Sequence, residues 1–184
     1  MAIGQWWLLG LGSAVLLGIS WRALGNWRSH GFYRFWAWEA IWLMLLLNAP
    51  YWFGDWGDWQ QQMAWLLLGL SLGLLFAGIY QMRRFGQAGS QRQDSELFAF
   101  ERTSQLVTSG IFAYIRHPMY GSLLLLAWGI AFKRLDTLML ALTGFASVML
   151  WLTARCEEHE CMAYFGDVYR QYMGRSKMFV PFVF

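Results

Sequence analysis

Charged residues are scarce in this chain, at 14% of its 184 residues, whereas 58% of them are hydrophobic. A spanning helix needs about 20 apolar residues, and several segments reach that length, which argues against a soluble helical protein with a large core. The 13 Trp and 14 Phe exceed what a soluble domain of this size needs. Tryptophan prefers the membrane–water interface, and pairs such as Trp6–Trp7 and Trp36–Trp38 stand near the ends of apolar runs.

The chain also has little cysteine and no extended basic module. Cys156 and Cys161 are its two cysteines, five residues apart in a predicted helix. Neighbours on a helix face lie three or four residues apart, so no disulfide is expected between them. A metal site would need more ligands, and none is predicted. Nucleic acid is not an expected partner, because no basic, aromatic-interleaved soluble module is present.

The apolar runs predict an all-α integral membrane protein of about five transmembrane helices. The expected spans cover about residues 3–21, 32–53, 63–82, 118–132 and 137–153. The last two are short and joined by residues 133–136, which predicts a tight helical hairpin, with a bent re-entrant pair as the alternative. We expect one membrane domain over residues 1–184, in which residues 1–82 form a three-helix scaffold. Gly69 and Gly73 form a small-xxx-small pair in the third span, which is typical of close helix packing.

Lysine and arginine in the short loops predict the orientation. The first and third loops and the C-terminal tail carry arginines, whereas the second loop has Asp55 and Asp58 and no basic residue. The N-terminus is therefore expected outside, and the C-terminus and the active site in the cytoplasm. The expected location is a bacterial inner membrane, with membrane lipids as partners. Lys133 and Arg134 go against this rule. The net charge of +3 fits attraction to anionic headgroups.

Two segments and one acid complete the outline of the chain. The polar stretch of residues 83–105 is expected to form a loop that covers a cytoplasmic site. A polar helix is expected from about residue 154 to 173, with an aromatic stripe on one face.

Glu39 in the second span is a functional candidate by its position in the membrane, or it reaches to the interface or pairs with Arg34 or Arg22. Asn48 is expected to bond another helix.

The first cluster of candidate site residues begins the fourth span. Pro118 fits the first turn of a helix, which places His117 at the N-cap, and free N–H groups at such a helix start attract a carboxylate or phosphate. Arg116 adds a positive charge, and Tyr120 adds a phenol about one turn further on. The alternative is that Arg116 reaches to the lipid headgroups and that Pro118 only starts the helix.

The second cluster follows the fifth span. Glu157 and Glu158 come directly after it, beside Arg155. Adjacent carboxylates on a helix face different ways, so one can meet a cation in a cleft while the other pairs with Arg155 or Arg175. The alternative is a solvated polar collar. Tyr169 and Tyr172 carry hydroxyls that suit a partly polar wall.

Together the two clusters resemble the isoprenylcysteine carboxyl methyltransferase family, within a wider group of membrane phospholipid methyltransferases. The resemblance lies in an Arg-His-Pro-x-Tyr helix start, a hairpin, paired glutamates, Phe165-Gly166, two tyrosines, Arg175 and Pro181. It covers about residues 97–184, the expected catalytic region, and residues 106–112 look like the lead-in to the histidine motif.

The resemblance implies a membrane methyltransferase with an S-adenosylmethionine site built from the last two spans and the cytoplasmic tail. The residues that match the family's cofactor-binding positions are Leu106, Val107, Phe112, His117, Tyr120 and Glu157. The residues that match positions at or near the reaction centre are Arg116, Glu158, Tyr169 and Arg175. Arg155 is the candidate for substrate binding. The acceptor implied is a lipophilic small molecule or lipid that offers a carboxylate, thiol or amine.

One departure bears on the acceptor. The eukaryotic enzymes place an arginine shortly before the glutamates to bind the substrate carboxylate, whereas this chain has Thr153 there and Arg155 two residues later. That puts a prenylcysteine substrate in doubt. Two other functions stay open from the sequence: a sterol-reductase-type membrane oxidoreductase that binds NADPH, and a non-catalytic lipid-binding or assembly protein.

Overall fold

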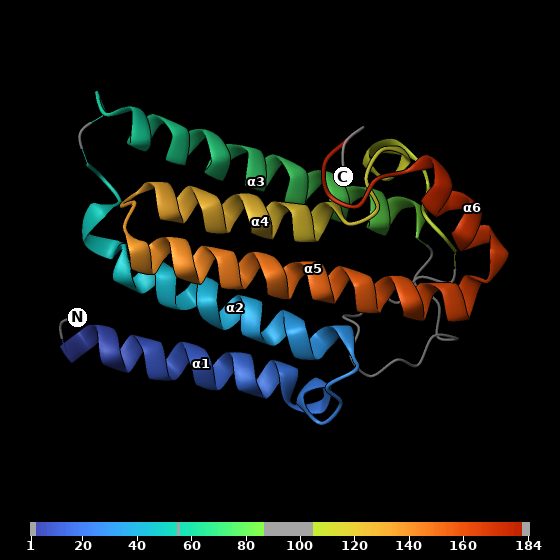
Figure 1. The fold of residues 1–184 in the computed structure, drawn as a ribbon, viewed down its shortest axis with the longest axis horizontal. Helices are drawn as coiled ribbons and strands as arrows, with labels where there is room; N and C mark the ends of the chain where they lie inside the picture. The colour runs from blue at the N-terminus through green and yellow to red at the C-terminus, as the bar shows by residue number, and fades with distance from the viewer. Residues whose placement is uncertain (1–2, 55, 87–104, 182–184) are drawn as a thin grey trace.

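In a computed structural model the chain is a bundle of long helices that run alongside one another (Figure 1). The structure describes residues 3–54, 56–86 and 105–181. The helices are α1 (Ile3–Leu24), α2 (His30–Leu47), α3 (Trp59–Phe85), α4 (Pro118–Phe132), α5 (Thr137–Phe165) and α6 (Asp167–Arg175), with short 3₁₀ turns η1 (Ala49–Tyr51) and η2 (Gly110–Ala113). The described residues form no strand beyond a single bridge, so the all-α prediction is confirmed.

Each of the five apolar segments expected to cross the membrane is a helix. By length and apolar composition α1, α3 and α5 can cross a bilayer, whereas α4 is a shorter apolar helix. At 15 residues, α4 is about 22 Å long, less than the roughly 30 Å of a hydrocarbon core. The second expected span is wrong at its end, since α2 stops at Leu47 rather than near residue 53, and Asn48 is its C-cap.

Polar side chains set several helix boundaries. Ser29 caps α2 by accepting from the N–H of Phe32, Asp58 caps α3 by accepting from Gln60, and Asp136 caps α5 by accepting from Met139. Such oxygens satisfy N–H groups that have no partner inside the helix. Asp136 also pairs with Arg134 at 2.6 Å, and the short link of residues 133–136 turns the chain from α4 into α5, as the predicted hairpin requires.

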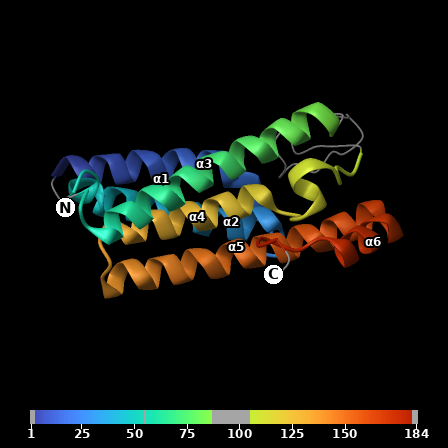
Figure 2. The same ribbon diagram turned by 90° about the horizontal axis from the view of Figure 1, so that it is seen from above.

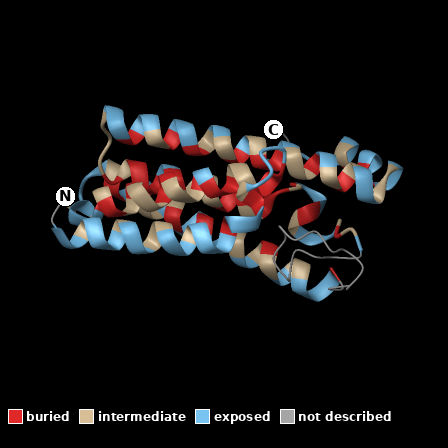
Figure 3. Cartoon of the chain, turned by 90° about the horizontal axis from the view of Figure 1, so that it is seen from below, coloured by how far each residue is buried: buried red, intermediate tan, exposed pale blue. Residues whose placement is uncertain are grey.

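The core lies between α2, α3, α4 and α5, while α1 packs along α2 at the edge of the bundle (Figures 1 and 2). Most of α1 is exposed (Figure 3), including Trp7, Leu11 and Trp21. An apolar helix face without protein cover fits a lipid environment. Asn48 donates to the carbonyl of Ile130 at 2.7 Å, so the expected bond from Asn48 to another helix is confirmed.

The glycines that bring helices together differ from the expected pair. Gly69 and Gly73 have open space where a side chain would project, so the prediction of close packing there is wrong. Instead a Cβ on Gly129 of α4 would lie 3.0 Å from Leu68, and one on Gly78 of α3 would lie 3.3 Å from Pro118. The sequence spacing identified small residues but not which face of α3 meets α4.

Two further expectations need correction. The polar helix expected over residues 154–173 is two helices, because α5 continues to Phe165 and Gly166 ends it with a φ of 60°. Glu39 pairs with neither Arg34 nor Arg22 but accepts a hydrogen bond from Ser13 of α1 at 2.7 Å. Most of the expected polar loop, residues 87–104, lies outside the described residues.

Candidate functional site

The candidate site lies at the end of the bundle where α4 begins and α6 packs (Figure 1). The chain enters through η2, where Gly110 has a φ of 59° and a side chain at that position would clash with Gln81 of α3. Pro118 is the first residue of α4 and His117 is its N-cap, as the sequence predicts. The turn therefore presents Arg116 and His117 at a helix start.

The segment after α6 runs beside this turn. Residues Ile115 and Lys177 form a parallel bridge, in which the N–H of Arg116 donates to the Lys177 carbonyl at 2.7 Å and the N–H of Lys177 donates to the Tyr114 carbonyl at 2.9 Å. The N–H of His117 donates to the Met178 carbonyl at 3.1 Å. These bonds fix the two segments to each other, so the chain after α6 becomes part of the site.

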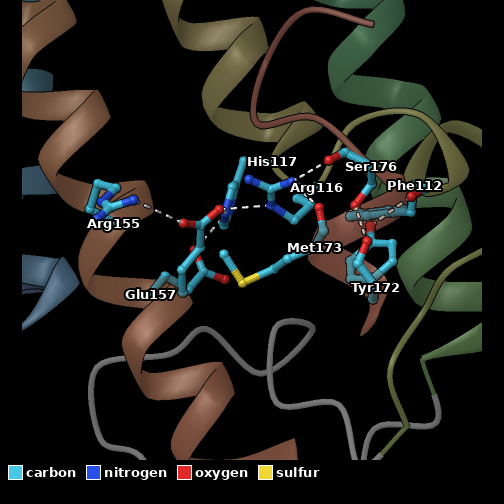
Figure 4. A network of polar contacts seen from close by, with 9 residues as sticks. Phe112, Arg116, His117, Arg155, Glu157, Tyr172, Met173 and Ser176 are labelled. Carbon is cyan, nitrogen blue, oxygen red and sulfur yellow. Dashed lines mark hydrogen bonds and ion pairs between the residues drawn. The ribbon is translucent and has the colours of Figure 1, made fainter. Parts of the chain in front are cut away.

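Arg116 is the centre of a polar network (Figure 4). Its Nε donates to Glu158 Oε1 at 2.7 Å, and Nη1 donates to the carbonyl of Met173 at 3.3 Å and to that of Ser176. The Glu158 side chain is buried, with 2% exposed. Removal of a charge from water is costly unless the charge is paired and hydrogen-bonded, so Arg116 is what permits Glu158 to be buried in ionised form.

His117 lies between the two glutamates. Its Nδ1 is 3.6 Å from Glu157 Oε2, and its Nε2 is 3.5 Å from Glu158 Oε1. Burial disfavours the charged imidazole, but hydrogen bonding and attraction from Glu157 and Glu158 outweigh it and raise the pKa of His117 above its usual value. Its ring stacks on Tyr120 at a centroid distance of 5.6 Å, and Tyr120 also hydrogen-bonds Glu157.

A pocket opens beside this network. Its lining residues come from α3, the turn before α4, α5 and α6: Met82, Leu106, Val107, Phe112, Arg116, His117, Glu157, Cys161, Phe165, Tyr169 and Tyr172. The wall thus combines apolar and aromatic side chains with one carboxylate and two basic groups. The pocket is narrow, about 60 Å³, whereas ligand pockets commonly hold roughly 300 Å³ or more, so a nucleoside-sized ligand requires its walls to move apart.

The two tyrosines of α6 form one side of the pocket. The hydroxyl of Tyr172 donates to the Phe112 carbonyl at 2.6 Å, which ties α6 to η2. Burial raises the pKa of Tyr172 to about 12 and raises the pKa of Tyr169 further. Both phenols are therefore neutral at physiological pH, and they offer hydroxyls and aromatic faces rather than negative charge.

Most residues that the sequence proposed for the site meet at this pocket, and some do not. Seven of them line it: Leu106, Val107, Phe112, Arg116, His117, Glu157 and Tyr169. Tyr120 and Glu158 support the lining residues through His117. Arg155 is half-exposed, with Nη1 4.0 Å from Glu158 Oε2. Arg175 does not line the pocket, and its exposed guanidinium lies 5.9 Å from the Tyr172 ring centroid.

Other lining residues were outside the proposed set. Phe165 and Tyr172 belong to the aromatic stripe that the sequence shows, and that stripe is the signal that points to them. Met82 and Cys161 carry no comparable signal, since an apolar residue at a helix end and a single thiol are common in any bundle. Among the described residues no group of three His, Cys, Asp or Glu side chains could hold a metal ion.

Comparison with known proteins adds evidence on the family. The sequence profile described as Phospholipid methyltransferase matches residues 59–169, more than half of the chain. This range takes in α3, which the sequence analysis grouped with the scaffold. No solved structure matches the chain.

Two curated relatives carry methyltransferase names. Methanethiol S-methyltransferase 2 of Bradyrhizobium diazoefficiens is 29% identical over 154 residues, which are 82% of this chain and 54% of the relative. Protein-S-isoprenylcysteine O-methyltransferase of Schizosaccharomyces pombe is 30% identical over 118 residues, 61% of this chain and 49% of the relative. The chain thus spans about half the length of these relatives.

Proposed function

This chain belongs to the phospholipid methyltransferase family, and from that premise we propose that it is an integral-membrane methyltransferase that uses S-adenosylmethionine. The acceptor is a lipophilic molecule that carries a thiol, amine or carboxylate. The observation that carries the proposal is that three charged or titratable side chains line one pocket. Arg116 and His117 come just before α4, and Glu157 comes from α5.

The lining residues fit the parts of such a cofactor. Glu157 offers a carboxylate to its ammonium group, and the N–H groups at the start of α4, with Arg116, suit its carboxylate. Leu106, Val107 and Phe112 offer apolar surface to the adenosyl part. Aromatic faces such as that of Tyr169 attract a cation, which suits a sulfonium. Because the pocket is narrow, the proposal requires that its walls move apart on binding.

The chain's contribution to the reaction is alignment. S-adenosylmethionine, when bound, would supply an electrophilic methyl group that the acceptor attacks in line, with the neutral thioether as leaving group. Arg116 holds Glu158, and the two glutamates favour the cationic form of His117, so the polar groups around the pocket are in position before any ligand enters. Preorganised charges of this kind need no rearrangement during the reaction, and a fixed line of approach lowers the entropic part of the barrier.

The position of the pocket supports a separate route for each ligand. It lies at the end of the bundle that carries Arg83, Arg84 and Arg170, the end that lysine and arginine bias places in the cytoplasm. The cofactor therefore enters from the cytoplasm, and a lipophilic acceptor enters sideways from the bilayer. The proposal has the N-terminus outside and a bacterial inner membrane as the location, and the same bias supports this orientation.

Binding of S-adenosylhomocysteine tests the site. Isothermal titration of the purified protein should give an affinity that falls about tenfold or more in Glu157→Gln and His117→Ala, because each loses a contact to a charged group worth about 1.5–3 kcal/mol. His159→Ala is the matched control, since His159 is exposed on the same helix. Unchanged affinity in both site variants would contradict the assignment.

The melting temperature of the purified protein distinguishes a methyltransferase from the alternative reductase. We expect S-adenosylhomocysteine to raise the melting temperature and NADPH to leave it unchanged. Stabilisation by NADPH alone would favour the oxidoreductase, and stabilisation by neither would favour a non-catalytic role.

A further inference from the structure

The three histidines of the chain occupy three different settings. His159 is exposed on α5. His117 lies between Glu157 and Glu158, whose attraction raises the pKa of its imidazole. His30, the first residue of α2, is buried with 1% of its surface exposed, and the proposed mechanism does not use it.

His30 is fixed by one carboxylate. Its Nδ1 lies 2.7 Å from Glu160 Oε2, and its backbone N–H donates to Glu160 Oε1 at 3.3 Å. Both oxygens of Glu160 are thus directed at one residue, 130 positions earlier in the chain. A carboxylate on Nδ1 holds the imidazole in the form that carries the proton on that nitrogen, which leaves the Nε2 lone pair able to accept a proton.

Nε2 of His30 is buried and makes no hydrogen bond to any described residue. An unsatisfied buried nitrogen costs free energy, and native structures keep few of them, often where a catalytic role or a ligand explains them. A general base needs this arrangement, in which Nδ1 is bonded to a carboxylate and Nε2 keeps a lone pair that can accept a proton.

Glu160 places this pair next to the proposed site. It follows Glu157 by three residues on α5, so the two share a helix face, and Glu157 lines the pocket. The charged groups that His30 experiences are Glu157 and Glu160 from α5 and Arg34 from α2. The start of α2 therefore faces the turn of α5 that carries the pocket's carboxylate. Neither His30 nor Glu160 lines the pocket as it stands, so contact of Nε2 with an acceptor requires the same opening of the walls that cofactor binding requires.

We propose that His30 and Glu160 form the proton-accepting pair for the methyl acceptor, and that this acceptor is a lipophilic thiol. The inference rests on the proposed methyl transfer. The acceptor's S–H bond breaks and its proton moves to His30 Nε2; the sulfur then forms a bond to the methyl carbon as the methyl–sulfonium bond breaks. The electron pair of that bond stays on the departing sulfur as a neutral thioether, and the proton leaves His30 for solvent.

The class of acceptor follows from the presence of a base. A carboxylate is already ionised at neutral pH, so its methylation gives no proton to a buried imidazole. A thiol, with an ordinary pKa near 8.5, is mostly protonated at pH 7 and gains reactivity when a base removes its proton.

A pH–rate experiment tests the role of His30. Methylation of 1-dodecanethiol by tritiated S-adenosylmethionine is measured from pH 6 to 10 in wild type, His30→Gln, Glu160→Gln and the control His159→Gln. At pH 7 we expect His30→Gln to lose about a hundredfold in kcat/KM, Glu160→Gln to lose less, and His159→Gln to match wild type. At pH 9.5 the thiol ionises unaided, so His30→Gln should approach the wild-type rate. A merely structural defect would not be repaired by raised pH.

A second readout does not depend on turnover. Because the chain has three histidines, ring-labelled protein gives three imidazole signals that His30→Gln and His159→Gln assign. Addition of 1-dodecanethiol to the S-adenosylhomocysteine complex should shift the His30 Nε2 signal and leave that of His159 in place. The carboxylate-bearing N-acetyl-S-farnesylcysteine should leave the His30 signal unchanged.

The outcomes separate this inference from the function on which it rests. Failure of wild type to bind S-adenosylhomocysteine would overturn the proposed function itself. Binding of S-adenosylhomocysteine with no shift of His30 at saturating thiol, or full activity of His30→Gln at pH 7, would overturn the role of His30. Methylation of the farnesylcysteine probe but not of the thiol would overturn the acceptor class alone.

Discussion

At the scale of single residues, the site is defined by which charges are buried and what neutralises them. Arg116 and Glu158 form a buried ion pair, with 10% and 2% of their side chains exposed. Two main-chain carbonyls complete the arginine's bonds. A buried pair of this kind adds little net stability, but loss of one partner leaves the other charge buried without compensation.

Arg116→Met should therefore destabilise the protein by about 3–5 kcal/mol, measured as the free energy of unfolding in mixed detergent. Arg175→Met is the matched control, because Arg175 is exposed on α6 and only faces the Tyr172 ring. We expect it to change stability by less than about 1 kcal/mol. Equal effects of the two substitutions would show that Glu158 is ionised without help from Arg116.

The sequence identified some of these residues and missed others for a physical reason. Arg116, His117 and Pro118 adjoin in the chain, and the helix-start preference of Pro118 places the other two. His30 carried no such signal, since its partner Glu160 lies 130 residues away and only the packing of α2 on α5 brings them together. Arg175 matched a motif, yet the direction of α6 keeps its charge in solvent.

At the scale of the helices, one residue decides how α6 meets the pocket. Gly166 has φ 60° and ψ −134°, a combination that is essentially confined to glycine. It ends α5 and turns the chain into α6, which returns Tyr169 and Tyr172 to the wall. The sequence predicted a continuous polar helix here because the aromatic spacing of three and four is the same on either side of the break.

Gly166→Ala should cost about 1–3 kcal/mol of stability through backbone strain alone, because a Cβ there meets nothing within 4 Å. It should also weaken S-adenosylhomocysteine binding, since α6 would leave its position. Thermal unfolding and calorimetric titration measure the two effects. Gly174→Ala is the control within α6, where space is also open and alanine favours the helix; an equal loss in that variant would contradict the account.

Helix starts were easier to predict than helix contacts. Asp136 and Pro118 act locally, so their roles could be read from a few residues, and the hairpin between α4 and α5 followed. The contact face of α3 depends on its rotation about its own axis. Gly69 and Gly73 were expected to face a neighbouring helix, but Gly78 of α3 and Gly129 of α4 do so instead.

At the scale of the whole molecule, packing accounts for Lys133 and Arg134, the two basic residues that go against the predicted orientation. The ammonium of Lys133 is buried, lies 3.7 Å from the Trp65 ring centroid, and donates to Gln61 and to the Trp52 carbonyl. Arg134 pairs with Asp136. Basic groups that are held by protein partners are expected to contribute less to orientation than free loop charges do, so we expect the arginines at the opposite end of the bundle to decide it.

Reporter fusions test this orientation. Green fluorescent protein at the C-terminus should fluoresce in bacterial cells, and alkaline phosphatase fused after Gly54, between α2 and α3, should be active outside the membrane. With the two reporters exchanged, alkaline phosphatase at the C-terminus should be inactive and green fluorescent protein after Gly54 should not fluoresce. The reverse pattern would place the pocket on the outer side, away from cytoplasmic cofactor.

The bridge between Ile115 and Lys177 has a consequence for biogenesis. The carbonyl of Ser176 that Arg116 bonds comes 60 residues later in the chain, after the whole α4–α5 hairpin. A ribosome therefore delivers that hairpin to the insertion machinery before the strand-like segment that completes the pocket emerges. If the proposed function holds, a nascent chain is therefore expected to lack a complete pocket for the methyl donor until its hairpin has been inserted.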